Sequence, residues 1–126
     1  MTGPAITFDT GALIALERRK ERAMKVYTHA RDRGLVVACP NVILAEWWRG
    51  RTDRREVVLS GLLVEPVPDE ILKLAGIALG KVPRATTIDA IVAAFAVQRT
   101  GVLYASDVAD FEALRSFFPA LRVFAI

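Results

Sequence analysis

The 126-residue sequence contains a single cysteine, Cys39, and a single histidine, His29. One cysteine cannot form a disulfide within the chain. Together with one histidine, it also cannot supply the nitrogen and sulfur ligands of a structural zinc site. We therefore expect that any metal ion bound by this chain has oxygen ligands.

Long apolar runs are also absent. No run reaches the ~18 residues of a membrane span, and residues 1–4 show neither the basic nor the apolar region of a signal peptide. Apolar types make up 53% and charged types 25% of the residues, which excludes a disordered chain. No repeat, linker or low-complexity segment interrupts the pattern. We expect one globular domain, residues 1–126, located in the cytoplasm and without contact to a membrane.

The net charge of +3 is modest, but the basic residues gather in two segments, 18–22 and 49–55. Acidic residues interrupt the first segment, which is typical of a solvated helix face. The second directly follows a pair of tryptophans, at least one of which we expect in the core. Phosphate binding and a solvated face are equally good interpretations of this second segment. Its basic residues are Arg49, Arg51, Arg54 and Arg55.

Short β-type segments alternate with longer helical ones along the whole chain. This order predicts a mostly parallel sheet with right-handed crossovers, arranged as a doubly wound α/β sandwich. The expected strands are residues 5–8, 35–39, 62–67, 102–106 and 121–126, the last at a sheet edge. The expected helices are residues 12–16, 20–32, 42–49 with Asn41 as N-cap, 53–61, 68–81, 87–99 and 107–117.

Two acidic residues follow expected strands. Asp9 comes directly after the first strand, and Asp107 after the fourth. In open α/β sheets, ligands bind in the crevice beyond the carboxyl ends of the strands. If these two strands are neighbours, both carboxylates face the same crevice.

Two further acids lie in apolar helical segments. Glu46 has mostly apolar neighbours three and four positions away, which is unfavourable unless the acid is paired, and Arg49 is a possible partner. Asp89 follows Thr86 by three residues, so the pair resembles a capping box. A structural role therefore explains each acid when it is taken alone.

The fourth acidic segment allows the same two interpretations. Asp107 and Asp110 suit the N-cap and N3 positions of the last helix, and either can be the acid of a functional site. Four acids in four separate motifs are harder to explain as caps alone. Two carboxylates ~4 Å apart repel by about 4 kcal/mol at an effective dielectric constant near 20. A cluster without soft ligands therefore indicates Mg²⁺ or Mn²⁺, and phosphodiester hydrolysis is the chemistry that follows most directly.

Four segments of the sequence resemble the acidic motifs of PIN-domain ribonucleases, in the same order: ITFDTGALIALE, CPNVILAEWWRG, TTIDAIVAAFAV and YASDVADFEAL. The chain length and the compact middle section are similar to the VapC toxins of type II toxin–antitoxin pairs. The resemblance implies a three-layer α/β/α PIN fold and Mg²⁺- or Mn²⁺-dependent endoribonuclease activity on RNA. It also implies a homodimer that is inhibited by a cognate VapB-type antitoxin.

By motif, the resemblance assigns an acidic quartet and two hydroxyl positions. It implies that three aspartates hold the metal ion and that Glu46 orients or deprotonates the attacking water. Of the two aspartates in the fourth motif we expect Asp107 to be the closer ligand, although Asp110 also fits. The quartet is Asp9, Glu46, Asp89 and Asp107; Thr10 and Ser106 would support it or contact phosphate, and the four arginines of residues 49–55 would bind RNA.

Two other classes of protein remain as alternatives. A phosphoacceptor receiver domain has similar length and aspartates at strand ends, but it has paired acids after its first strand and a lysine after its last. Here Thr10 and Gly11 follow Asp9, and Lys81 is the last lysine in the chain. The second alternative is a catalytically silent RNA-binding or interaction domain whose acids serve only as helix caps.

Overall fold

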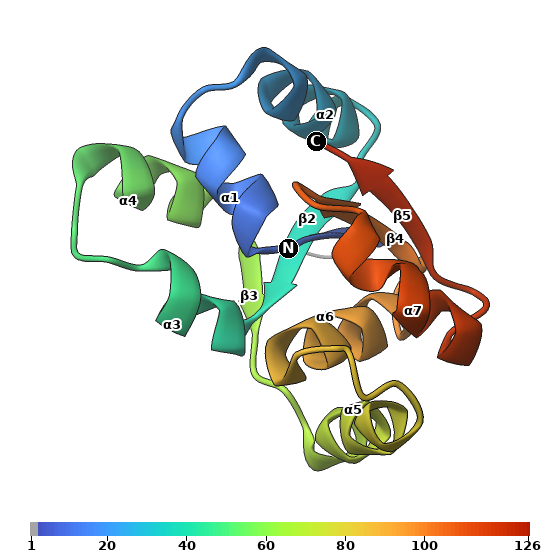
Figure 1. The fold of residues 1–126 in the computed structure, drawn as a ribbon. Coiled ribbons are helices and arrows are strands. Elements are labelled where there is room, and N and C mark those ends of the chain that lie inside the picture. Colours follow the sequence, from blue (N-terminus) through green and yellow to red (C-terminus); the bar gives the residue numbers. More distant parts are fainter. Residues whose placement is uncertain (1–2) are drawn as a thin grey trace.

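The computed structural model describes residues 3–126 and contains a five-stranded sheet of order β3-β2-β1-β4-β5 (Figure 1). Each pair of neighbouring strands is parallel, as predicted, and β1 lies between β2 and β4. This order differs from the 2-1-3-4-5 order of receiver domains. The strands are β1 (Ala5–Phe8), β2 (Val36–Pro40), β3 (Leu63–Glu65), β4 (Val102–Ala105) and β5 (Arg122–Ala125).

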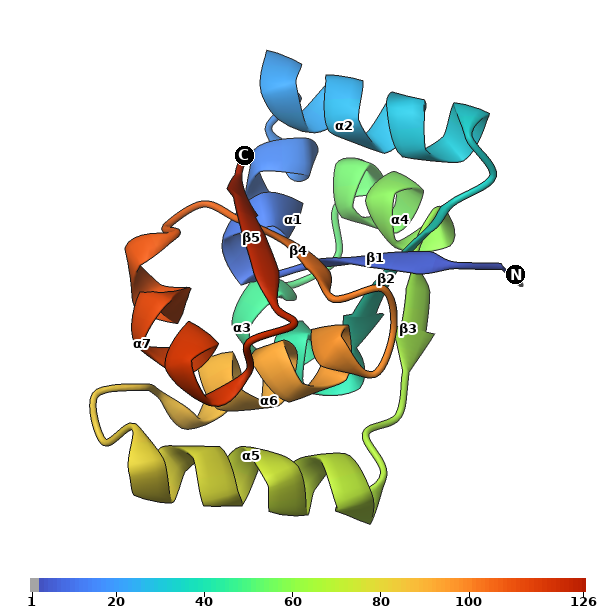
Figure 2. The same ribbon diagram turned by 90° about the vertical axis from the view of Figure 1, so that its right-hand side faces the viewer.

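Helices cover both faces of the sheet, so the protein has three layers. Figure 2 shows α1, α2 and α4 on one side and α5 and α6 on the other. Among the described residues, 3–126, no helix combines the length and apolar character needed to cross a membrane. The helices are α1 (Thr10–Glu17), α2 (Glu21–Asp32), α3 (Leu44–Trp47), α4 (Asp53–Ser60), α5 (Asp69–Lys81), α6 (Thr87–Val97) and α7 (Ala109–Phe117).

The core lies against the two central strands. Every residue of β1 and β2 is buried, which explains their continuous apolar composition. In α6 all residues from Ala90 to Ala96 are buried, and four of these seven are alanine. Small side chains on every face of α6 allow it to pack between α5 and the sheet. This packing places the N-terminal end of α6, which contains Asp89, beside the carboxyl ends of β1 and β4 (Figure 1).

Two predicted helix starts were wrong. Residues 41–43 form a single 3₁₀ turn, η1 (Asn41–Ile43), so Asn41 lies inside the turn rather than capping a helix. Helix α3 then ends at Trp47, because Trp48 has an extended backbone with ψ of 91°. Helix α7 begins at Ala109 instead of residue 107, because the Asp107 carboxylate accepts a hydrogen bond from the Ala109 amide at 3.1 Å.

Helix α1 packs closely against the residue that follows β4. A Cβ atom added to Gly11 would lie 2.6 Å from the Cβ of Ser106 and would also overlap its hydroxyl. Real Cβ atoms do not approach this closely, so the absence of a side chain at Gly11 lets α1 lie against the end of β4. This contact fixes the spacing between the first and fourth acidic motifs.

We predict that Gly11→Ala destabilises the protein by about 1–3 kcal/mol, because the added methyl group overpacks the contact. Adding Ser106→Gly should recover most of this loss. Gly76→Ala is the matched control: Gly76 lies in α5 with open space around it, so alanine should stabilise by roughly 0.5–1 kcal/mol. Urea unfolding of the wild type and these three variants tests the contact, and a neutral Gly11→Ala would contradict it.

Candidate active site

Acidic side chains from four separate segments line one small pocket beside the carboxyl ends of β1 and β4. The pocket has a volume of about 180 Å³. The aspartates after β1 and at the start of α6 therefore share a crevice, as the sequence predicted. The polar residues that line the pocket are Asp9, Thr10, Glu46, Asp89, Ser106 and Asp110.

Asp9 links the end of β1 to the start of α1. Its backbone N–H donates to the Tyr104 carbonyl of β4 at 3.1 Å, and its carboxylate caps α1 by accepting from the Ala12 N–H at 2.7 Å. The pKa of Asp9 is raised to about 6, chiefly by burial and with smaller contributions from the nearby charges of Asp89 and Asp110, although the Ala12 amide opposes the rise. The carboxylate is thus positioned by its capping bond but lies in an environment that disfavours its charge.

Asp89 lies in the first turn of α6 and is half-buried. The hydroxyl oxygen of Thr86 accepts from the Asp89 backbone N–H at 3.1 Å, so the predicted capping role of Thr86 is confirmed. Burial raises the pKa of Asp89, and the charges of Asp110 and Glu46 add to this effect. A hydrogen bond between the Asp89 carboxylate and the Thr86 side chain partly opposes this rise, so Thr86 holds both the backbone and the side chain of Asp89 beside the pocket.

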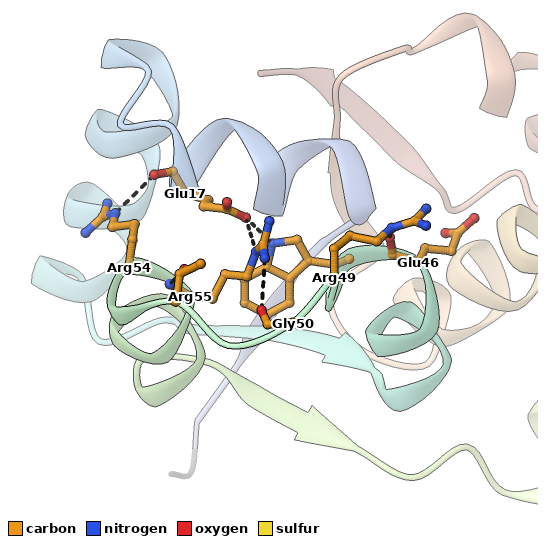
Figure 3. A network of polar contacts seen from close by, with 8 residues as sticks. Glu17, Glu46, Arg49, Gly50, Arg54 and Arg55 are labelled. Carbon is orange, nitrogen blue, oxygen red and sulfur yellow. Dashed lines mark hydrogen bonds and ion pairs between the residues drawn. The ribbon is translucent and has the colours of Figure 1, made fainter.

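Glu46 is exposed at the rim of the pocket instead of lying among apolar side chains. Its carboxylate accepts a hydrogen bond from the Thr10 hydroxyl at 2.6 Å. Arg49 does not take the predicted role of ion-pair partner: its Nε donates to the Glu46 backbone carbonyl at 3.0 Å (Figure 3). The Glu46 carboxylate is therefore held by α1 and not by an arginine.

The structure separates the two aspartates of the fourth motif. Asp110, in the first turn of α7, lines the pocket, and its charge raises the pKa of both Asp9 and Asp89. Asp107 is not among the residues that line the pocket. Its carboxylate makes the bond to the Ala109 amide described above, and its charge adds less than that of Asp110 to the raised pKa of Asp89. This placement favours Asp110 over Asp107 as the fourth acid of the pocket, the reverse of our expectation from the sequence.

The arginines of residues 49–55 have different surroundings. Arg54 donates to the backbone carbonyls of α1, and Arg55 forms an ion pair with Glu17 at 3.1 Å (Figure 3). Arg51 is exposed and pairs with Asp53 at 3.1 Å, and Arg49 is also exposed. Only part of this segment therefore presents free guanidinium groups to solvent, a distinction that charge clustering in the sequence does not reveal.

The chemistry of the donor set fits a hard divalent cation. Like charges around the pocket raise the pKa of Asp9 and Asp89, and a cation would relieve that repulsion. Within residues 3–126, no three His, Cys, Asp or Glu side chains are close enough together to hold a metal ion by themselves. Mg²⁺ does not require one, because it is usually bound through one or two carboxylates together with water and substrate phosphate.

A larger cavity of about 700 Å³ lies elsewhere, between α2 and the sheet. Its lining includes Ile6, Met24, Leu35 and Tyr104 and none of the acids of the small pocket. An apolar groove of this kind can hold another apolar surface, but it has no cluster of oxygen ligands. The smaller acidic pocket is therefore the candidate site for a cation.

The raised pKa of Asp9 predicts how the stability of the metal-free protein depends on pH. A carboxyl group whose pKa is higher in the folded than in the unfolded chain destabilises the fold as pH rises from 3.8 to about 6 and above. The difference between these pKa values corresponds to about 3 kcal/mol at most. Asp9→Asn keeps an oxygen to cap α1, so it should stabilise the metal-free protein at pH 7.5 and have little effect at pH 3.5.

Chemical unfolding at these two pH values, with a chelator present, measures the effect. Asp53→Asn is a suitable control because the Asp53 side chain is 95% exposed, and we expect a change within about 0.5 kcal/mol at either pH. Destabilisation by Asp9→Asn at pH 7.5 would mean that the Asp9 carboxylate is needed chiefly as a charged helix cap.

Comparison with known proteins identifies the fold. No family model matches the chain, and no curated protein matches its sequence. One chain of the crystal structure of VapBC2 from Rickettsia felis, bound to a DNA fragment from their promoter, superposes with a TM-score of 0.71 at 12% identity, covering 96% of this chain and 98% of that one. PAE2754 from Pyrobaculum aerophilum superposes with a TM-score of 0.55 at 23% identity, covering 94% and 91%. The chain therefore has a three-layer α/β/α, PIN-like fold.

Proposed function

We propose that this protein is a metal-dependent endoribonuclease toxin of the VapC type. The observation that carries the proposal is the convergence of carboxylates from four separate segments on one pocket, where they raise the pKa of Asp9 and Asp89. Such an arrangement is unfavourable without a cation, and natural proteins keep unfavourable electrostatics mainly where function needs them. The likeness of the fold to a chain of a VapBC complex supports the same conclusion.

In the proposed reaction Asp9, Asp89 and Asp110 would hold Mg²⁺ or Mn²⁺ together with water and substrate phosphate, because no three of the described acidic side chains are close enough to hold an ion by themselves. The bound ion supplies positive charge at a phosphoryl oxygen and increases the acidity of water near it. Glu46 orients the attacking water and accepts its proton, while the Thr10 hydroxyl fixes the direction of the Glu46 carboxylate.

RNA would reach the pocket across its exposed rim. Arg49 lies three residues beyond Glu46 and is exposed. Arg51 is also exposed, and its ion pair with Asp53 is open to solvent, so we assign phosphate contacts to these two before Arg54 and Arg55. The Ser106 hydroxyl at the opposite wall of the pocket is a further candidate. Because these contacts displace counterions from the phosphates, affinity for RNA should fall as salt increases.

Incubation of the purified protein with total RNA tests the activity. We expect cleavage with Mg²⁺ or Mn²⁺, none with excess chelator, and none with Asp89→Asn or Asp110→Asn. Asp107→Asn should retain most of the activity because Asp107 lies outside the pocket lining. Glu46→Gln should lower the rate by about 100-fold, the lower range of general-base contributions.

The same variants separate the enzyme from a silent domain of the same fold. A chain whose acids are only helix caps would bind RNA with or without metal ions and would not cleave it. Circular dichroism of each variant must show intact folding, so that lost activity reports on chemistry. Loss of cleavage in Asp107→Asn with retention in Asp110→Asn would restore our sequence-based choice of ligand.

We further propose a VapB-type antitoxin as protein partner, a homodimer as the assembly and the cytoplasm as the location. The support for the antitoxin is that the structural neighbour is itself a VapBC complex. Co-expression with the small open reading frame adjoining the gene should yield a stable complex that cleaves RNA more slowly than the toxin alone. Light scattering would measure the mass of both species, and a monomeric free toxin would exclude the homodimer.

A further inference from the structure

Glu17, the last residue of α1, lies in a network of hydrogen bonds outside the acidic pocket. Its carboxylate accepts from the indole N–H of Trp47 at 2.9 Å and from the Nε of Arg55 at 3.1 Å. The Glu17 and Arg55 side chains are only 19% and 18% exposed, and Trp47 is buried. The ion pair between Glu17 and Arg55 is therefore partly shielded from solvent. Its geometry affects its energy more than the geometry of a surface pair would.

The same network ties the first turn of α4 to the last turn of α1. Arg54 donates to the Glu17 carbonyl at 3.2 Å (Figure 3) and to the Leu16 carbonyl at 2.9 Å. Arg55 also donates to the Gly50 carbonyl at 2.9 Å, which holds the segment between α3 and α4 against the start of α4. Helix α4 and the segment before it are thus fixed to the C-terminal end of α1.

Helix α3 needs this external support. It is four residues long, too short to be stable by itself, and its N-terminal residue has no side-chain cap. Glu46 and Trp47 are consecutive residues of α3: the Trp47 side chain enters the core, and the Glu46 side chain reaches the rim of the pocket. The orientation of Trp47 therefore determines where the Glu46 carboxylate lies.

The two ends of α1 hold the two neighbouring residues of α3. Thr10, the first residue of α1, bonds the Glu46 carboxylate, and Glu17, its last residue, bonds the Trp47 indole. We infer that Glu17 is a positioning residue, which fixes Glu46 in the catalytic pocket through Trp47 and Arg55. This inference rests on the proposed nuclease function for its kinetic consequences, but not for its structural ones.

Hydrogen exchange of the metal-free protein tests the structural part without any assay of activity. In Glu17→Gln, we expect the backbone amides of residues 44–48 to exchange about tenfold faster than in the wild type, while those of β1 and β4 change less than twofold. Glu21→Gln is the matched control. It makes the same charge change four residues further along the chain, in an ion pair with Lys25 where the Glu21 side chain is 81% exposed. It should leave exchange at residues 44–48 unchanged.

Kinetics on RNA test the catalytic part. Glu17→Gln and Trp47→Phe should each lower kcat about tenfold and change KM less than twofold, because neither residue lies in the pocket lining. In a Glu46→Gln background the same Glu17→Gln change should have little further effect on kcat, since it would act through a group already removed. Arg55→Lys, which keeps the positive charge, should lose less activity than Arg55→Gln.

The outcomes distinguish this inference from the proposed function. If the wild type does not cleave RNA but exchange at residues 44–48 still rises in Glu17→Gln, the nuclease proposal fails and the positioning of α3 by Glu17 stands. If the wild type cleaves RNA and Glu17→Gln has unchanged exchange and kcat, the inference is overturned and the nuclease proposal stands. A general loss of protection that includes β1 and β4 would also overturn it, because Glu17 would then support the whole fold.

Discussion

Repulsion between half-buried carboxylates is the interaction on which the acidic pocket depends. Asp9 and Asp89 have raised pKa values because burial removes water and because neighbouring acids face the same small volume. The parallel sheet brings the ends of β1 and β4 to the same edge, and Asp110 reaches the pocket from α7, the helix that follows β4. Each acid has a local partner that keeps its backbone in place, so the fold tolerates a cluster that a cation would stabilise.

Helix α1 connects the parts of the site. Its N-terminus carries the Asp9 cap and the Thr10 hydroxyl, its second residue lies directly against Ser106, and its C-terminus bonds the segment beyond α3. The eight residues of α1 therefore belong to or contact three of the four acidic motifs, namely the first, the second and the fourth. The fourth, at the start of α6, is placed by packing, because its alanine-rich helix fits closely between α5 and the sheet. Rigid elements, and not loops, thus set most of the geometry of the pocket.

The sequence predicted the parallel fold from the alternation of short β-type and longer helical segments, because that order depends only on local periodicity. It left open whether the first and fourth strands are neighbours, and the structure shows that β1 and β4 pair. The grouping of Asp9, Glu46 and Asp89 was expected from the resemblance of their motifs to those of PIN domains, and the structure places all three around one pocket. The choice between Asp107 and Asp110 depended on whether α7 begins at residue 107 or two residues later, and one side-chain bond to Ala109 decides this. Local spacing carries no such information.

The arginines of residues 49–55 illustrate a second limit, because identical charges close together in the sequence have different functions in space. Arg54 and Arg55 use their donors on α1, so their contribution to a positive surface is reduced, whereas Arg49 remains beside Glu46. A polyanion approaching a pocket lined by four carboxylates meets repulsion at short range. Attraction from two exposed arginines is weak compensation in water, where each exposed pair of charges contributes little. A bound divalent ion would offset part of this negative charge and would present positive charge to the phosphate, so in this protein binding of the phosphate and its cleavage would depend on the same cation.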